Sequence, residues 1–282
     1  MTISTELNED ELRTWIGRTE QAEDVISPRL VREFLATLDK GEDLPALGSP
    51  APLAIHWCLS PPTVKASGLG PDGHPQRGGF LPPVPLPRRM WAGGQLQFHD
   101  QLRVGDVVRR KSVIEDVSVK QGRSGRLCFV AVRHLLSTAR GLALNERHDI
   151  VYRDFEVGAV SKPALADLPK PERMQEQKAD PTLLFRYSAI TFNGHRIHYD
   201  RPYATKIEGY PGLIVHGPLQ ATLLLHFAEE IIGRPLAQFE FRGLQPLFDF
   251  EAFRLCARPT EANLALWVAT LDGKQSMEAK AS

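Results

Sequence analysis

The sequence predicts an α+β protein of two lobes, and three observations lead to this prediction. Strand-like runs follow Trp91 and return after residue 236, one long apolar helix lies between the two groups, and a proline-rich segment precedes the first group. At 282 residues the chain exceeds one typical domain but is short for two large ones. We therefore expect two lobes or one large domain.

The first lobe is predicted over residues 1–157. Eleven prolines lie between Pro45 and Pro87, a density that excludes long helices and central strands there. Because Trp57 and Phe80 are interspersed, we expect an ordered loop packed over another part of the protein. The turn QGRSG at 121–125 separates two strands as in a hairpin. Strands that together predict an antiparallel sheet are expected at 95–98, 107–120, 126–136 and 142–155.

The second lobe is predicted over residues 182–282, after a linker at 158–181 that is rich in Lys, Glu, Ala and Pro. A helix is expected from about Leu213 to Ile232, closed by Gly233. Further strands are expected at 238–242, 252–258 and 263–271. The second lobe is thus expected to be a central helix wrapped by a sheet.

Charge and cysteine content exclude several classes of protein. Lys plus Arg and Asp plus Glu both total 34, so no long-range field favours nucleic acid or an anionic membrane. Three well-separated cysteines argue against a disulfide framework and a cysteine-based metal site. No stretch reaches the ~20 apolar residues of a membrane span. We expect a cytoplasmic protein without nucleic-acid or membrane partners.

The segment from Ser188 to Asp200, SAITFNGHRIHYD, has the composition of an active site. Eighteen residues after His198 comes His216-Gly217, which opens the long helix. An imidazole can move a proton, and the N–H groups of a helix start can hold a developing oxyanion. By contrast, we expect His216 and His226 to be buried, hydrogen-bonded core histidines. The pair His195 and His198 has no placed third ligand, so no metal is expected.

This segment, together with Tyr203 and PGLIVHGPL at 211–219, resembles the signature of the MaoC-like, or type 2, hydroxyacyl-thioester dehydratases. The resemblance implies a double hotdog fold, with two antiparallel sheets that each wrap a central helix. Residues 70–99 are similar to the degenerate N-terminal half of the double-hotdog subgroup, which includes itaconyl-CoA and mesaconyl-C4-CoA hydratases. The resemblance covers most of the chain.

The resemblance also implies roles for individual residues. His198 falls at the catalytic histidine of the family, and Gly217 at the glycine whose N–H binds the thioester oxygen. Asn193 falls where the family has a catalytic aspartate, and an amide can neither accept nor release a proton near neutral pH. We therefore expect His198 to carry most of the proton transfer and Asn193 to orient the water. His195 or Asp200 could assist.

The expected function is hydration of an acyl-CoA thioester, without a cofactor, by a homo-oligomer for which a dimer is favoured. The preferred substrate is itaconyl-CoA or mesaconyl-C4-CoA, which would be hydrated to citramalyl-CoA in itaconate degradation. Two alternatives stay open: a 3-hydroxyacyl-thioester dehydratase of fatty-acid metabolism, and a noncatalytic acyl-CoA-binding hotdog protein. Arginine suits a free carboxylate. Candidate substrate-binding residues are Arg88, Arg89, Arg196, Arg201, His195 and Tyr203, with Arg88 or Arg89 favoured for the carboxylate.

Overall fold

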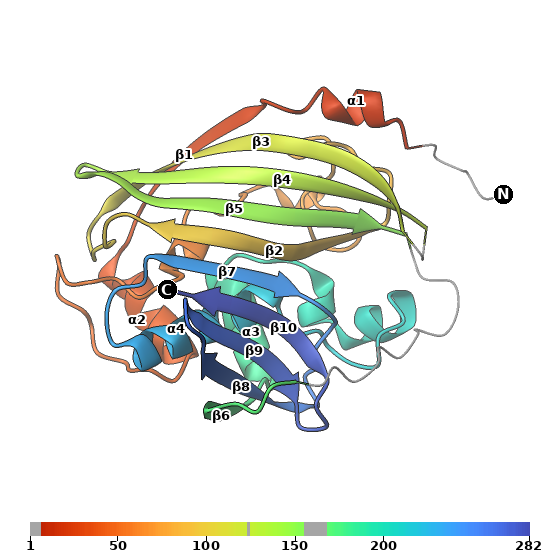
Figure 1. Cartoon of the computed structure of the whole chain (residues 1–282). Helices are drawn as coiled ribbons and strands as arrows, with labels where there is room; N and C mark the ends of the chain where they lie inside the picture. The colour runs from red at the N-terminus through yellow and green to blue at the C-terminus, as the bar shows by residue number, and fades with distance from the viewer. Residues whose placement is uncertain (1–6, 123–124, 155–167) are drawn as a thin grey trace.

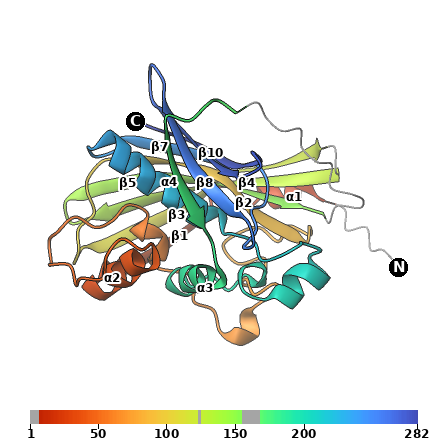
Figure 2. The same ribbon diagram turned by 90° about the horizontal axis from the view of Figure 1, so that it is seen from below.

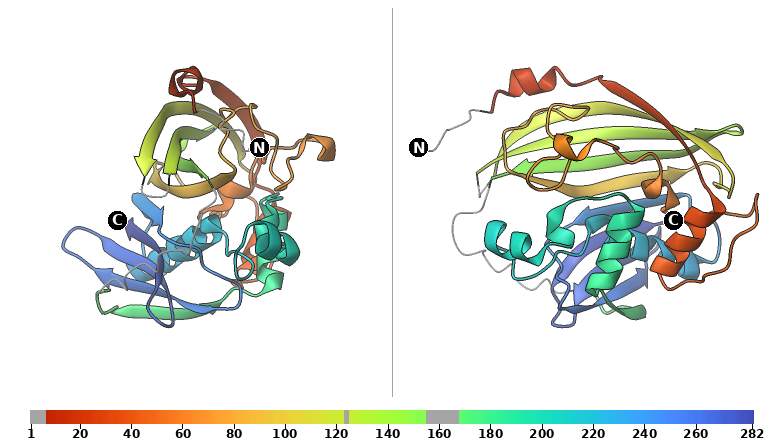
Figure 3. Two further views of the ribbon diagram at one scale, coloured as in Figure 1. Left: turned by 90° about the vertical axis from the view of Figure 1, so that its right-hand side faces the viewer. Right: turned by 180° about the vertical axis from the view of Figure 1, so that it is seen from behind.

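A single antiparallel sheet forms the frame of the molecule. The computed structural model describes residues 7–122, 125–154 and 168–282, and within them ten strands lie in the order β1-β3-β4-β5-β2-β7-β10-β9-β8-β6 (Figure 1). Helices α2, α3 and α4 lie together on one face of the sheet (Figure 3). The α+β class is confirmed, but the two expected sheets are joined into one. The join is the pairing of β2 with β7, from Gly93↔Arg242 to Gln97↔Gln238.

The strands have the following bounds: β1 Thr19–Val25, β2 Arg88–Phe98, β3 Val107–Gly122, β4 Gly125–Thr138, β5 Gly141–Arg153, β6 Arg173–Lys178, β7 Gln238–Gly243, β8 Ala252–Pro259, β9 Leu264–Thr270 and β10 Gln275–Ala281. The α-helices are α1 Glu9–Arg13, α2 Pro28–Thr37, α3 Pro181–Ile190 and α4 Gly217–Ile232. Single turns are η1 Ile55–Cys58, η2 Ala66–Gly68, η3 Arg196–His198 and η4 Tyr203–Ile207.

The two halves of the sheet repeat one topology. The order β1-β3-β4-β5-β2 in the first half corresponds strand for strand to β6-β8-β9-β10-β7 in the second. Helix α2 begins three residues after the end of β1, and α3 begins three residues after the end of β6; each has a proline in its first turn. Ser27 caps α2 and Asp180 caps α3, each accepting the backbone N–H three residues on. The two helices pack side by side (Figure 2).

The halves differ where a central helix should begin. Ala51 donates its N–H to Leu102 O at 2.8 Å, and Val215 donates equivalently to Leu247 O at 2.8 Å. After Val215 the chain enters α4, which is buried from Leu219 to Ala228 and ends at Gly233 with φ +67°. After Ala51 it forms only the four-residue η1.

The expectation of a central helix in each half is therefore wrong for the first half. Ser60 has a φ of +46°, and Pro61 and Pro62 follow it, so a helix cannot continue from η1. The predicted helix of the second half also begins later than expected, because residues 213–215 bridge to the chain before β8. In the described ranges, no helix is long and apolar enough to cross a bilayer.

Three strands escaped prediction. Strand β6 lies inside the predicted linker at 158–181, so the second half of the sheet begins at Arg173; residues 155–167 and the hairpin tip at 123–124 lie outside the described residues. β1 and β6 are the two edges of the sheet. Their sequences, TEQAEDV and RMQEQK, are mostly polar and exposed, as edge strands often are, and give no apolar alternation. Strand β10 was also missed.

Without a central helix, the first half carries buried polar groups on the face that α4 covers in the second. Ser112, His134 and Glu146 are direct cross-strand neighbours on β3, β4 and β5. Glu146 accepts hydrogen bonds from Trp57 of η1 and from His148, both at 2.6 Å. Although burial opposes it, the nearby His148 and His56 hold the pKa of Glu146 well below its usual range.

The long loop before β2 docks on the loop between α3 and α4. Gly73 has a φ of +87°, and a Cβ there would lie 1.9 Å from Gly194 O. Arg196 donates its backbone N–H to Asp72 O and its Nη1 to Pro71 O, both at 2.9 Å. The expectation of an ordered loop packed over another part is confirmed, and the part it covers is the predicted active-site segment.

Replacing Gly73 with alanine should therefore dislodge this contact. We expect Gly73→Ala to lower the free energy of unfolding by about 2 kcal/mol more than Gly17→Ala does. Gly17 is a matched control, because its φ is +85° and nothing lies within 4 Å of a Cβ added there. Urea unfolding of the two variants measures the difference. Equal losses would mean that the loop does not depend on this close approach.

Candidate active site

The predicted segment begins at the end of α3, where the backbone takes a helix-ending turn. Asn193 N–H donates to Ser188 O at 2.8 Å, and Phe192 before it has a φ of +51°. Asn193 Oδ1 accepts the backbone N–H of His195 at 3.0 Å. The carbonyl end of the Asn193 side chain thus holds the turn, and its NH₂ group is the end that could meet a water.

His198 lies buried at the end of η3, with a relative exposure of 6%. Its Nδ1 is 2.8 Å from Ile214 O, which can only accept, so Nδ1 carries the proton and Nε2 holds a lone pair. Burial lowers the pKa of His198 to about 4, although the bond to Ile214 acts in the opposite direction. At neutral pH this imidazole is uncharged and can accept a proton at Nε2.

His216 and Gly217 connect this base to the helix start. The His216 ring stacks on His198 with centroids 3.7 Å apart, and its Nε2 lies 2.8 Å from Ser188 Oγ. His216 is fully buried, and His226 is buried with Nε2 3.0 Å from Leu53 O, so both are packed core histidines as predicted. Gly217 begins α4, where backbone N–H groups have no partner within the helix.

The first half contributes to the same place through β2. A Cβ added to Gly217 would lie 3.4 Å from Trp91 Cε3, so the Trp91 ring packs against the helix start. Trp91 also meets Trp57 edge-on, with ring centroids 5.4 Å apart. The candidate site therefore lies between the halves, with base and helix start from the second and a wall from the first.

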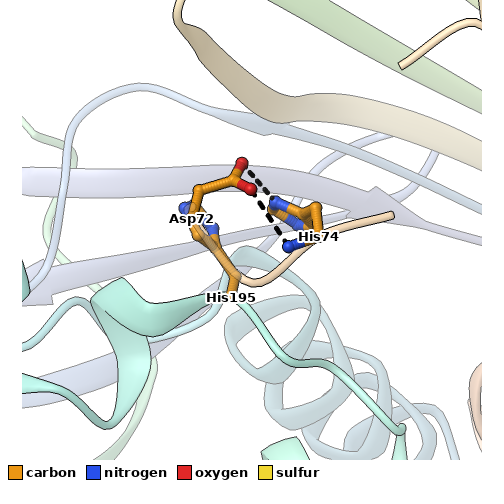
Figure 4. Close-up of side chains that lie close together, drawn as sticks. All are labelled: Asp72, His74 and His195. Atoms are coloured by element: carbon orange, nitrogen blue, oxygen red, sulfur yellow. Dashed lines mark hydrogen bonds and ion pairs between the residues drawn. The ribbon is translucent and has the colours of Figure 1, made fainter. Parts of the chain in front are cut away.

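Two residues at this site were missed by the sequence analysis. His74 Nδ1 is 3.0 Å from Asp72 Oδ2, and the His74 backbone N–H donates to Asp72 Oδ1 at 3.1 Å (Figure 4). The His74 ring centroid is 4.2 Å from that of His195, which is 5.4 Å from that of His198. In the sequence, the two residues show only an Asp-x-His spacing in a loop about 120 residues before the motif. This spacing alone does not predict a catalytic role.

The pKa values of this group reflect its burial and its charges. Burial lowers the pKa of His74, and Arg89 and Arg77 add to this effect, whereas Asp72 opposes it. Burial also lowers the pKa of His195, with further contributions from His74 and His198. One ligand atom from each of Asp72, His74 and His195 lies within 4.8 Å of the others, so the group could also take a cation. The expectation that no metal is bound stays a prediction.

Three of the four predicted arginines hold the protein together. Arg88 Nε donates to Glu208 Oε2 at 3.1 Å, and its guanidinium lies over the Tyr210 ring. Arg196 pairs with Asp200, with Nη2 2.7 Å from Oδ2. Arg201 pairs with the buried carboxylate of Asp249. Each of these guanidinium groups therefore already has an acidic partner, and the assignment of the three residues to substrate binding stays a prediction.

Tyr203 also makes contacts within the fold, and its assignment to substrate binding stays a prediction. Its ring lies under the Arg196 guanidinium at 4.2 Å, its hydroxyl is 3.3 Å from Glu208 Oε1, and it is 7% exposed. Arg89 lies opposite the buried Tyr152 across β2 and β5. Its positive charge contributes to the lowered pKa values of both His74 and His195.

Comparisons with known proteins agree with this arrangement. Mesaconyl-C(4)-CoA hydratase of Chloroflexus aurantiacus is 47% identical over 268 residues, covering 94% of this chain and 95% of the relative. A MaoC-like dehydratase from Phytophthora capsici superposes with a TM-score of 0.69 at 15% identity, covering 98% of both chains. A Mycobacterium tuberculosis protein described as a double hotdog fold has a TM-score of 0.54 at 12% identity, covering 94% of this chain and 95% of that one.

The two solved structures show that the fold is a double hotdog. A family model for hydroxyacyl-thioester dehydratase type 2 matches residues 54–249, a range that includes β2, the long loop, the motif and α4. The chain therefore belongs to the hydroxyacyl-thioester dehydratase type 2 family.

Proposed function

We propose that this chain adds water to the C=C bond of an enoyl-CoA thioester that carries a free carboxylate, with mesaconyl-C4-CoA as the first candidate. As a member of a dehydratase family, the chain is a hydro-lyase. The observation that carries the proposal is the buried, uncharged His198 next to the start of α4, which pairs a base with an oxyanion donor. The 47% identity to a mesaconyl-C(4)-CoA hydratase supports the acyl group.

The site can perform the reaction with balanced proton transfers. His198 Nε2 takes a proton from water as the oxygen bonds to the β-carbon. As negative charge develops on the thioester oxygen, this oxygen accepts a hydrogen bond from the Gly217 N–H. Such a donor can stabilise the transition state by about 3 kcal/mol. The imidazolium then returns its proton to the α-carbon, so one water is added and His198 is restored.

The carboxylate requires a cation close to the reacting carbon. In mesaconyl-C4-CoA the free carboxylate is attached to the β-carbon and the double bond is conjugated with the thioester; in itaconyl-CoA the double bond is not conjugated. A buried carboxylate without a cation is costly. Arg89 is the best-placed arginine of the four, because its charge already acts on His74 and His195, whereas Arg88, Arg196 and Arg201 pair with acidic residues.

A 3-hydroxyacyl-thioester dehydratase is the second candidate, because the matching family model bears that description. The same base and oxyanion donor would run the reverse reaction. Purified protein should be assayed with mesaconyl-C4-CoA, itaconyl-CoA and crotonyl-CoA by enoyl-thioester absorbance and by mass spectrometry for the added water. Preference for mesaconyl-C4-CoA supports the proposal. Preference for crotonyl-CoA would favour the dehydratase, and no turnover of any thioester would contradict both.

Removing the His198 imidazole should abolish most of the turnover. We expect His198→Ala to lower kcat by about 100-fold or more, as the loss of a positioned proton carrier does. His99→Ala serves as a control, because His99 is exposed on the loop after β2 and should leave kcat within about 2-fold. Thermal unfolding checks that both variants fold. A His198→Ala variant that keeps half the activity would rule out His198 as the base.

Two substitutions at Asn193 test whether its side chain orients the water or only stabilises the turn at the end of α3. Asn193→Asp should remain at least partly active, since one carboxylate oxygen can still accept the His195 N–H and the other can hold a water. Asn193→Ala loses both and should be much worse. Steady-state kcat and the melting temperature of both variants are the measurements. Equal loss of kcat would show that the NH₂ group is what matters.

Arg89 should determine selectivity for the carboxylate. Arg89→Ala should raise KM for mesaconyl-C4-CoA at least ~10-fold more than KM for crotonyl-CoA, because only the first substrate leaves a carboxylate unpaired. Arg88→Ala is the matched control: it removes the neighbouring guanidinium, which pairs with Glu208, and should lower stability without changing the KM ratio. An unchanged ratio in Arg89→Ala would contradict carboxylate binding by this residue.

A further inference from the structure

Asn193 of the motif can neither take nor release a proton, and the long loop brings a carboxylate and an imidazole to the same place. Asp72 and His74, from the loop before β2, lie against His195 of the motif (Figure 4). Nothing else in the proposed reaction uses this pair.

We propose that His74 is a second water-binding catalytic residue of the hydration site, and that the carboxylate of Asp72 positions it. This inference rests on the hydratase function proposed above. Water between two acceptors would give one hydrogen to His198 Nε2 for transfer and donate the other to His74 Nε2. The transferred proton returns from His198 to the α-carbon, so His74 starts and ends each turnover uncharged.

The hydrogen bonds fix which nitrogen of His74 faces the substrate. An ionised carboxylate only accepts, so the 3.0 Å contact to Asp72 Oδ2 places a proton on Nδ1. Nε2 of the uncharged ring is then an acceptor. Burial opposes ionisation of Asp72, but its hydrogen bonds from His74 lower the pKa of this carboxyl, so it stays ionised. This is the tautomer control that a carboxylate gives to a catalytic imidazole in hydrolases.

The pair is anchored from both sides and remains accessible. The Gly73–Gly194 contact and the bonds from Arg196 to Pro71 and Asp72 fix the loop backbone on the motif. The side chains of His74 and Asp72 keep exposures of 19% and 24%, so a small molecule can reach them. The pair is thus attached to the motif by several backbone contacts, although it comes from the other half of the chain.

The variants should separate the roles of the two side chains. His74→Asn keeps an amide donor near the Nδ1 position, and so its bond to Asp72, but has no Nε2. It should lower kcat by about 100-fold with KM within about 3-fold. Asp72→Asn should also lower kcat, because its NH₂ can donate to Nδ1 and move the ring proton to Nε2. The exposed His99→Asn is the control and should stay within about 2-fold of the wild type.

Rescue and pH dependence distinguish this role from a structural one. Adding Asn193→Asp to His74→Asn should recover at least ~10-fold in kcat, because the motif then carries a carboxylate that can accept a hydrogen bond from the water. His74 and His198 must both be uncharged to act, so wild-type kcat/KM should fall as the pH drops through their pKa values. In His74→Asn only the limb of His198, with its pKa of about 4, should remain. The titratable and charged groups near His74 are Asp72, His195, His198, Arg77 and Arg89, and they stay unchanged in the variant.

Several results would overturn the proposal. If the wild type is active but His74→Asn matches it, or if Asn193→Asp gives no rescue, His74 is not a catalytic residue. If a chelator abolishes activity and Zn²⁺ or Mn²⁺ restores it, Asp72, His74 and His195 form a metal site instead. If the wild type hydrates no thioester of the panel, the proposed function itself fails, and the role of His74 fails with it. Nitrogen NMR of the wild type should show His74 protonated at Nδ1.

Discussion

The structure depends on the edge-to-edge pairing of β2 with β7. This pairing turns two half-sheets into one and places the first half of the chain over the start of α4. Trp91, two residues before the paired segment, packs on Gly217, and the charge of Arg89 on the same strand contributes to the lowered pKa values of His74 and His195. Gly94 permits the join, because a Cβ there would lie 2.7 Å from the Phe241 ring of β7. The site exists only because both halves meet here.

The repeat also explains why the chain has one such site and not two. Ala51 and Val215 make equivalent hydrogen bonds, so Pro52 stands at the position of His216 and Leu53 at that of Gly217. No long helix begins there, and no dipole end is available for an oxyanion. A cavity of about 140 Å³ lies at this place, lined by residues that include Leu53, His56, Phe98, Glu229 and Leu236. The first half has no long helix at this position, and it contributes the loop with Asp72 and His74 and the ring of Trp91.

Local patterns in the sequence predicted much of the second half. The spacing of Asn193, His198 and Gly217, and the closing Gly233, are short-range features, and the structure brings His198 and the helix start together as expected. Edge strands β1 and β6 were missed because their exposed polar residues carry no period. The sequence could not separate Arg88 from Arg89, since Glu208, the partner of Arg88, lies on another segment; the same holds for Asp249, the partner of Arg201. The Asp72–His74 pair was missed for the same reason: its meaning depends on a contact across the fold.

The central claim is that thioester chemistry takes place between His198 and the start of α4, with the acyl group enclosed by both halves. A crystal structure with an unreactive thioester analogue of mesaconyl-C4-CoA tests it most directly. The account predicts the carbonyl oxygen within hydrogen-bonding distance of Gly217 N, the β-carbon beside His198 Nε2, and the carboxylate on Arg89. An acyl group seated elsewhere, for example in the cavity beside Leu53, would contradict the account.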